Sequence, residues 1–73
     1  MKVTYDKEAD AAYIYLEYPI AAGGVDKTLQ CRDDIMLDFD SKGKLLGIEV
    51  LDASKILNKK LLRDAHQLAQ LSH

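Results

Sequence analysis

The first half of the chain alternates apolar and polar residues with the period of two that is typical of β-strands. Val3 and Tyr5 alternate with Lys2 and Thr4, which predicts a half-buried strand over residues 1–5. The next apolar stretch is rich in Tyr and Ile, which are favoured in strands, and carries bulky side chains on both faces. It predicts a second, central strand.

That second strand is expected over residues 11–18, and three further strands follow at 25–31, 35–39 and 44–51. Polar turns rich in Asp and Gly separate the last three, and Gly43 takes positive φ at little steric cost. Consecutive strands joined by short turns favour an antiparallel meander. We therefore predict an antiparallel β-meander of about five strands.

Beyond Asp52 the apolar period becomes that of a helix, with a residue every three or four positions. The stripe consists of Ala53, Ile56, Leu57, Leu61, Ala65, Leu68 and Ala69, with Leu62 and Leu71 at its margin. It predicts a C-terminal helix over about residues 54–71, with Asp52 or Ser54 as the N-cap. Asn58 is a weak helix former, at which a short first turn can end. A helix on one face of the sheet gives a single α+β domain over residues 1–73.

The face of the sheet away from this helix is predicted to be too apolar to stay in water. It carries Tyr13, Tyr15, Met36, Leu45 and Leu51, mixed with the acids Glu17, Asp38 and Glu49. Apolar patches of this kind on small proteins mark interaction sites. We expect Tyr15, Met36, Leu45 and Leu51 to form an interface.

The size of the chain points the same way. A core built from 73 residues is small, and such domains usually need a disulfide, a metal or a partner to be stable. Cys31 is the single cysteine, so no intrachain disulfide forms, and it is predicted to be a small, inert, buried hydrophobe. We expect a homodimer or a complex with another small protein.

The free thiol and the N-terminus without an apolar segment predict a cytoplasmic protein, and no apolar run is long enough for a membrane span.

Charge is distributed unevenly along the chain. Residues 1–52 hold eleven acids and six bases, whereas residues 53–73 hold one acid and four bases, for an overall net charge of −2. An acidic body is a poor surface for a phosphate backbone. Nucleic-acid binding through Lys55, Lys59, Lys60 and Arg63 is therefore an alternative that we weigh below a solvated helix face.

The first group of chemically interesting residues is Tyr5, Asp6, Asp10 and Tyr13. Two carboxylates four positions apart around a turn can share a proton or bind a cation. Asp side chains in turns more often accept hydrogen bonds from backbone N–H groups. We favour that structural role, with the two tyrosine rings packed in the core.

The second group, Asp38, Asp40 and Glu49, follows the spacing of a calcium-binding EF-hand loop, with Gly43 at its sixth position. Lys42 occupies a ligand position, and the flanking segments are predicted strands instead of helices. A hairpin turn is the simpler interpretation. We predict no metal site, no cofactor and no catalytic residues.

Two ordered motifs carry a family resemblance over about residues 2–57. The first is Tyr5-Asp6-x-x-x-Asp10-x-x-Tyr13-Ile14, and the second runs from Ile35 through Asp38-Phe39-Asp40-x-x-Gly43 and Gly47-Ile48-Glu49 to Asp52-Ala53-Ser54. The chain resembles domain-of-unknown-function family 2283, which comprises small prokaryotic proteins. The resemblance implies no activity. It implies that the motif residues, including Asp52, characterise the family, and it assigns none of them to a known site. Some such proteins look like half of a two-gene pair, which implies a regulatory or antitoxin-like role.

From these observations we expect a protein-interaction module that self-associates or binds a partner, and not an enzyme. A small-ligand or metal-binding protein that uses its Asp, Glu and Tyr side chains is the main alternative.

Overall fold

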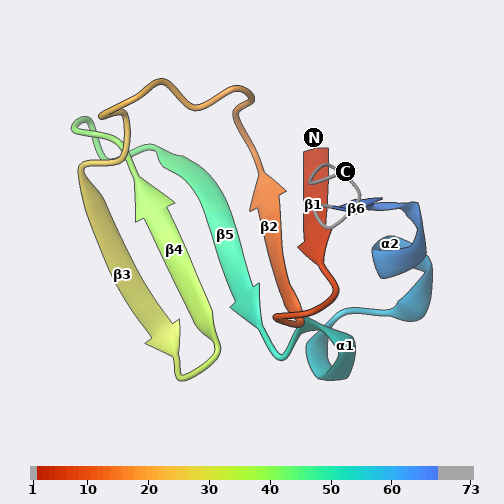
Figure 1. The fold of residues 1–73 in the computed structure, drawn as a ribbon. Helices are drawn as coiled ribbons and strands as arrows, with labels where there is room; N and C mark the ends of the chain where they lie inside the picture. The colour runs from red at the N-terminus through yellow and green to blue at the C-terminus, as the bar shows by residue number, and fades with distance from the viewer. Residues whose placement is uncertain (1, 68–73) are drawn as a thin grey trace.

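The computed structural model describes residues 2–67, which form one sheet and two short helices (Figure 1). The strands are β1 (Lys2–Asp6), β2 (Ala11–Tyr15), β3 (Lys27–Arg32), β4 (Ile35–Phe39), β5 (Leu45–Leu51) and β6 (His66–Gln67). The helices α1 (Ala53–Ile56) and α2 (Lys59–Asp64) lie between β5 and β6 along the chain.

The sheet has the strand order β3-β4-β5-β2-β1-β6. The first five strands pair antiparallel, and β6 adds to β1 in parallel. The predicted α+β class with a meander-like antiparallel sheet is confirmed. Because β5 returns to pair with β2, the β2–β3 connection crosses one end of the sheet, and β2 becomes a central strand as expected.

Two strands are shorter than predicted on either side of this long connection. β2 ends at Tyr15 because the carbonyl oxygen of Leu46 accepts from both Leu16 N (2.9 Å) and Glu17 N (3.1 Å), which ends the regular ladder. β3 begins at Lys27, two residues later than expected. The pattern therefore located each strand but extended it into the loop.

The predicted C-terminal helical region is confirmed, with the break at Asn58 that the sequence indicated, but it does not extend over residues 54–71. Asn58 has extended backbone and its side chain accepts a hydrogen bond from Leu61 N (2.8 Å), so it ends the first turn and caps α2. α2 ends at Asp64, and His66–Gln67 is a strand. The remaining part of the predicted helix, residues 68–71, lies outside the described residues.

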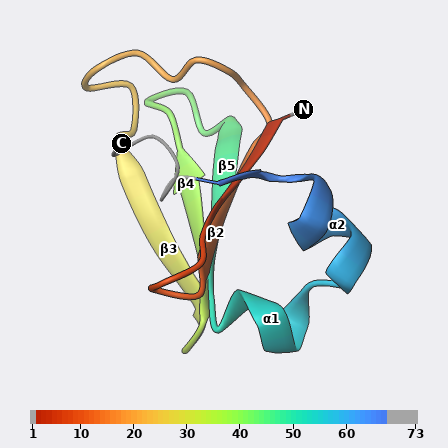
Figure 2. The ribbon, with the colours of Figure 1, turned by 45° about the vertical axis from the view of Figure 1, so that its right-hand side comes forward.

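The core lies between the helices and the β1–β2–β5 part of the sheet. Its buried members are Tyr5, Ala12, Val50, Ala53, Leu62 and Ala65, and Val3, Ile14, Ile48, Ile56 and Leu57 pack against them. Figure 2 shows the sheet nearly edge-on, with both helices on one side of it. Leu62, which the sequence placed at the margin of the stripe, is buried because the break at Asn58 changes the phase of the helix.

The helices cover only part of that side. In both views they lie at the β1–β2 end of the sheet, and within residues 2–67 no helix lies beside β3 and β4 (Figures 1 and 2). All six residues of β3 are exposed. No helix within residues 2–67 has the length and apolar character needed to cross a membrane.

Candidate functional site

The first polar cluster joins the β1–β2 turn to the start of α1. Tyr5 Oη donates to Asp10 Oδ1 (2.7 Å), and the same carboxylate accepts from Ser54 N (2.9 Å) and Ser54 Oγ (2.7 Å). Ala53 N donates to the carbonyl oxygen of Asp10 at 2.9 Å. Asp10 therefore performs the capping role that the sequence assigned to Asp52 or Ser54, although it lies far away along the chain.

The electrostatics of this cluster favour a charged Asp10. The hydrogen bonds from Ser54 and then Tyr5 hold the pKa of the Asp10 carboxyl below its ordinary value. The hydrogen bond to Asp10 raises the pKa of the Tyr5 phenol, and burial adds to the effect. A carboxylate with several donors and a neutral phenol form a structural brace, and neither is poised for proton transfer near neutral pH.

Asp6 and Asp52 have local roles in turns. Asp6 Oδ1 accepts from Glu8 N (3.1 Å) and Ala9 N (3.3 Å), the turn function predicted for it. Asp52 sits before α1 with φ of 51°, a left-handed conformation that Asp tolerates, and its side chain makes no cap.

The second polar cluster lies on the opposite face of the sheet. Tyr13 Oη donates to Asp38 Oδ2 (2.7 Å), and Thr28 Oγ1 donates to Asp38 Oδ1 (2.6 Å). These residues come from β2, β4 and β3, so the cluster spans the sheet across β5. Tyr13 and Asp10, which share the first motif, thus lie in separate clusters on separate faces.

Gly47 makes the second cluster possible. It stands in β5 between Tyr15 and Asp38, its register partners on either side. A Cβ atom on Gly47 would lie only 2.7 Å from Tyr13 Cε2, so the tyrosine ring crosses the strand through the space where a side chain would be. Burial of the ring, followed by the hydrogen bond to Asp38, raises the pKa of the Tyr13 phenol.

An aromatic row continues from this cluster. The Tyr13 and Tyr15 rings meet edge to face with centroids 4.6 Å apart, and Tyr15 meets Tyr18 in the same manner at 5.0 Å. Lys2 Nζ lies 4.1 Å from the centroid of the Tyr18 ring and donates to its hydroxyl at 3.0 Å. The row extends beyond the end of β2 and leaves Tyr18 exposed.

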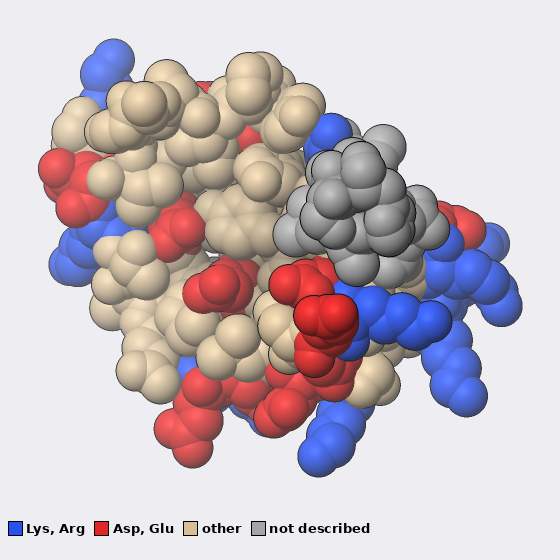
Figure 3. All heavy atoms as spheres, in the orientation of Figure 1, with Lys and Arg blue, Asp and Glu red and all other residues tan. Residues whose placement is uncertain are grey.

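We call this side of the sheet the helix-free face, and define it by Thr4, Tyr13, Tyr15, Thr28, Met36, Asp38, Glu49 and Leu51, whose register places them together. Figure 3 looks onto it: acidic side chains lie over its middle and lower part, and Lys and Arg side chains lie mostly at the periphery. Of the four expected interface residues, Tyr15 and Met36 are half-buried on this face and Leu51 is exposed on it. Leu45 is exposed but was expected on the wrong face, because the shift in the β4–β5 register pairs it with Phe39, which lines the groove on the other face.

Asp40 belongs to the β4–β5 turn. Its Oδ1 accepts from Lys42 N (2.9 Å) and Lys44 N (2.8 Å), and Gly43 has φ of 80°. Strands flank this turn, as expected, and Glu49 pairs with Met36 further along β5. Among the described residues, no group of three or more His, Cys, Asp or Glu side chains is arranged to hold a metal ion.

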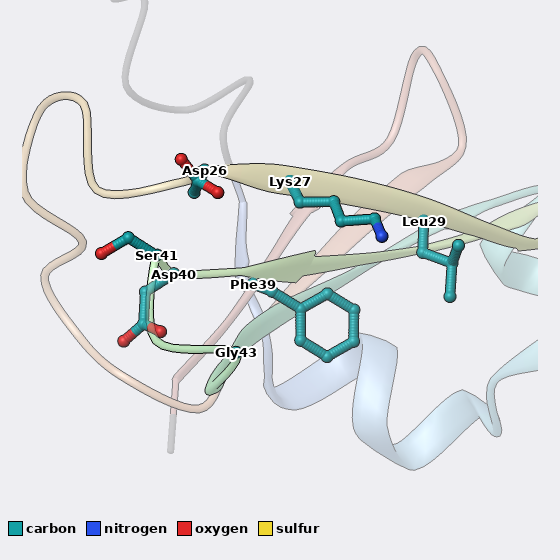
Figure 4. A pocket seen from close by; sticks show the side chains of 7 residues that line it. All are labelled: Asp26, Lys27, Leu29, Phe39, Asp40, Ser41 and Gly43. Carbon is teal, nitrogen blue, oxygen red and sulfur yellow. The ribbon is translucent and has the colours of Figure 1, made fainter.

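A groove of about 400 Å³ lies beside β3 on the face that the helices partly cover (Figure 4). Lys27, Leu29 and Phe39 project into it from the strands, and Asp26, Asp40, Ser41 and Gly43 complete its lining. Cys31, on the same strand, is exposed. The prediction that it is buried was wrong, because β3 is an edge strand whose register shifts between Gln30 and Arg32.

Three contacts escaped the sequence interpretation: Ser54 with Asp10, Thr28 with Asp38, and Tyr13 over Gly47. Each joins strands or turns that are distant in the sequence. Only the position of Gly47 inside a strand gave a signal, because an internal strand glycine often marks close approach by another group.

The fold and these clusters define a small α+β domain in which paired tyrosines and aspartates fasten the sheet from both sides. A model of the family described as "Protein of unknown function (DUF2283)" matches residues 2–54. The chain belongs to this family. The expected resemblance is thereby confirmed.

An uncharacterised protein of the archaeon Methanocaldococcus jannaschii is 41% identical over 58 residues. The aligned region covers 80% of this chain and 46% of that relative, so the chain spans about half the relative's length. No solved structure matches the chain.

Proposed function

We propose that this protein is an interaction module that acts through self-association or through binding another protein. The supporting observation is the contrast between its core and its surface. Leu16, Tyr18, Val25, Leu29, Leu45 and Leu51 are 36–56% exposed. Three of the seven buried apolar residues in the described part of the chain are alanines.

This contrast has an energetic meaning. Burial of apolar surface contributes about 25 cal/mol per Å², so a core rich in alanine yields little, and further burial against another chain adds stability directly. A regulatory or antitoxin-like role in the cytoplasm is the more specific form of the proposal. Its support is the family resemblance.

The test is the mass of the purified protein in solution over a wide range of concentration, measured by sedimentation equilibrium and light scattering. In parallel, the tagged chain is used to capture partners from a native lysate. We expect a concentration-dependent dimer or a stoichiometric complex. A monomer at every concentration that captures no partner contradicts the proposal.

Ligand binding by the Asp, Glu and Tyr side chains stays a prediction, and so does nucleic-acid binding by the basic residues of α1 and α2. The carboxylates of Asp6, Asp10, Asp38 and Asp40 all accept internal hydrogen bonds. No specific contact favours either alternative.

A further inference from the structure

Among the described residues, the outer side of β3 is the longest stretch of unpaired strand edge in this sheet. At the other edge, β6 pairs with β1 at Thr4 and Tyr5, whereas no described strand lies along the outer side of β3. An edge strand presents unpaired backbone groups to any extended chain, and proteins usually protect it with charged residues in its middle. In β3, charges stand only at the ends, at Lys27 and Arg32.

The hydrogen bonds of β4 show which backbone groups of β3 point outward. On one side of β4, Leu51 N donates to the oxygen of Asp34 (2.8 Å). On the other side, Asp26 N donates to the oxygen of Phe39 (2.8 Å). Since backbone groups alternate in direction along a strand, even-numbered residues of β4 face β5 and odd-numbered residues face β3.

The pairing of β3 with β4 then determines the direction of the backbone groups of β3. Leu29 pairs with Leu37 and Lys27 pairs with Phe39, so the backbone groups of Leu29 and Lys27 are directed towards β4. Those of Thr28 and Gln30 consequently point away from the sheet. They are the outward groups of the regular part of the strand, ahead of the register shift after Gln30.

We propose that β3 pairs antiparallel with β3 of a second copy, with Leu29 at the two-fold axis. This inference rests on the proposed function and names the surface and the partner. In that register Thr28 lies opposite the partner's Gln30, and Gln30 lies opposite the partner's Thr28. The outward N–H and C=O groups of both residues are therefore paired. Leu29 and the partner's Leu29 form the non-hydrogen-bonded pair, in which Cα atoms approach to about 4.5 Å and side chains are closest.

The side chains complement one another in the same register. Leu29 is 47% exposed and lines the groove beside Phe39, so the partner's Leu29 covers apolar surface that is otherwise in water (Figure 4). Antiparallel pairing also brings Asp26 to the end of the paired segment at which the partner's Arg32 lies, beyond the register shift, and Arg32 contacts Asp34 of its own chain at 2.8 Å. A closed two-fold contact of this kind is self-limiting, since it uses the open edge of both copies.

The first test replaces Leu29 with Lys and measures the dimer dissociation constant by sedimentation equilibrium. Two like charges then meet at the axis, and we expect the dissociation constant to rise by more than about tenfold. Ala9→Lys is the control, because it adds the same charge at an exposed apolar position in the β1–β2 turn, away from β3. Gln30→Pro, which removes an outward N–H, should weaken the dimer as well, and Gln30→Ala should not.

The second test reads the register. In a Cys31→Ser background, Leu29→Cys should form an intermolecular disulfide on mild oxidation, because the distance across the axis suits a disulfide. In the same background, position 30 of one copy lies opposite position 28 of the partner, so the two thiols of Gln30→Cys are further apart. This variant should crosslink much less. Preferential crosslinking at position 30 overturns the proposed register.

The outcomes separate this inference from the proposed function. A dimer, or a captured partner complex, that is unchanged by Leu29→Lys and Gln30→Pro overturns the β3 pairing and leaves the interaction module standing. A monomer that captures nothing overturns both. Circular dichroism of each variant verifies that the sheet is folded before its mass is interpreted.

Discussion

At the scale of single residues, the tyrosines and aspartates of the family motifs act as fasteners. Asp10 holds the start of α1, and Asp38 holds Tyr13 and Thr28 across the sheet. Each carboxylate accepts from a partly buried phenol and from a second, exposed donor, so both networks lie near the surface and their carboxylates are hydrogen-bonded.

Asp10→Asn should destabilise the protein in a pH-dependent manner. The pKa of the Asp10 carboxyl is lowered in the folded state, so its contribution to the free energy of unfolding is present above its ordinary value of 3.8 and is lost as the pH falls through the folded pKa. Asn tolerates the φ of 52° at this position, so the change isolates the carboxylate. The free energy of unfolding of wild type and of Asp10→Asn is measured by urea unfolding at a series of pH values.

The difference in stability between wild type and Asp10→Asn should therefore be largest near neutral pH and shrink below about pH 4. Asp33→Asn, at an exposed position, is the control. A difference that is the same at pH 7 and at pH 3 contradicts the role given to the charge.

Gly47→Ala should displace the Tyr13 ring, because the new Cβ overlaps it. We expect a loss of about 1–3 kcal/mol, typical of overpacking, measured by chemical unfolding. In a Tyr13→Ala background the same change should cost far less, since the ring is gone. Equal costs in the two backgrounds would mean that Tyr13 does not occupy this space.

At the scale of elements, the strands follow from the sequence better than the helices do. Strand positions depend on alternation and turn residues, which are local, and each of β1 to β5 lies where the pattern placed it. The helical region depends on one side chain, because Asn58 offers its oxygen to Leu61 N and so begins a new helix. A periodic stripe alone does not distinguish one long helix from two short ones.

Asn58→Ala should destabilise the protein by about 1 kcal/mol, the usual cost of losing an N-cap. Asn58→Asp keeps an acceptor at the same place and should retain most of the stability. Thermal unfolding of the two variants side by side measures the effect. If Ala and Asp variants are equally stable, the hydrogen bond to Leu61 contributes nothing.

The candidate site was predictable only in part for a related reason. Turn roles such as those of Asp6 and Asp40 depend on neighbours in the sequence and were foreseen. The partners of Asp10 and Asp38 depend on register between distant segments, which composition and spacing do not contain. The exposure of Cys31 was missed because the pattern of a strand does not reveal whether it is central or at an edge.

At the scale of the whole molecule, the sheet is asymmetric: one end is covered by helices and the other is open. The backbone amides of Lys27 and Leu29 point towards β4, and those of Thr28 and Gln30 point away from the sheet. The two sets should differ in their rate of hydrogen exchange, because hydrogen-bonded amides are protected from exchange with solvent.

Amide hydrogen exchange should therefore show alternation along β3. At low protein concentration the amides of Thr28 and Gln30 should exchange fast, and those of Lys27 and Leu29 more slowly. At high concentration, where β3 pairs with a second copy, Thr28 and Gln30 should become protected. Protection that does not depend on concentration, measured by nuclear magnetic resonance, would contradict pairing at this edge.

The bond between Asp10 and Ser54 also has a consequence for synthesis of the chain. Its two ends lie 44 residues apart, and contacts of such separation form late because a long loop must first close. During translation, β1 and β2 can meet soon after they emerge, but Asp10 cannot reach Ser54 before residue 54 has emerged as well. Until then the nascent β1–β2 hairpin has a charged turn without its two Ser54 donors, and the start of α1 closes on that turn only after β3, β4 and β5 have been made.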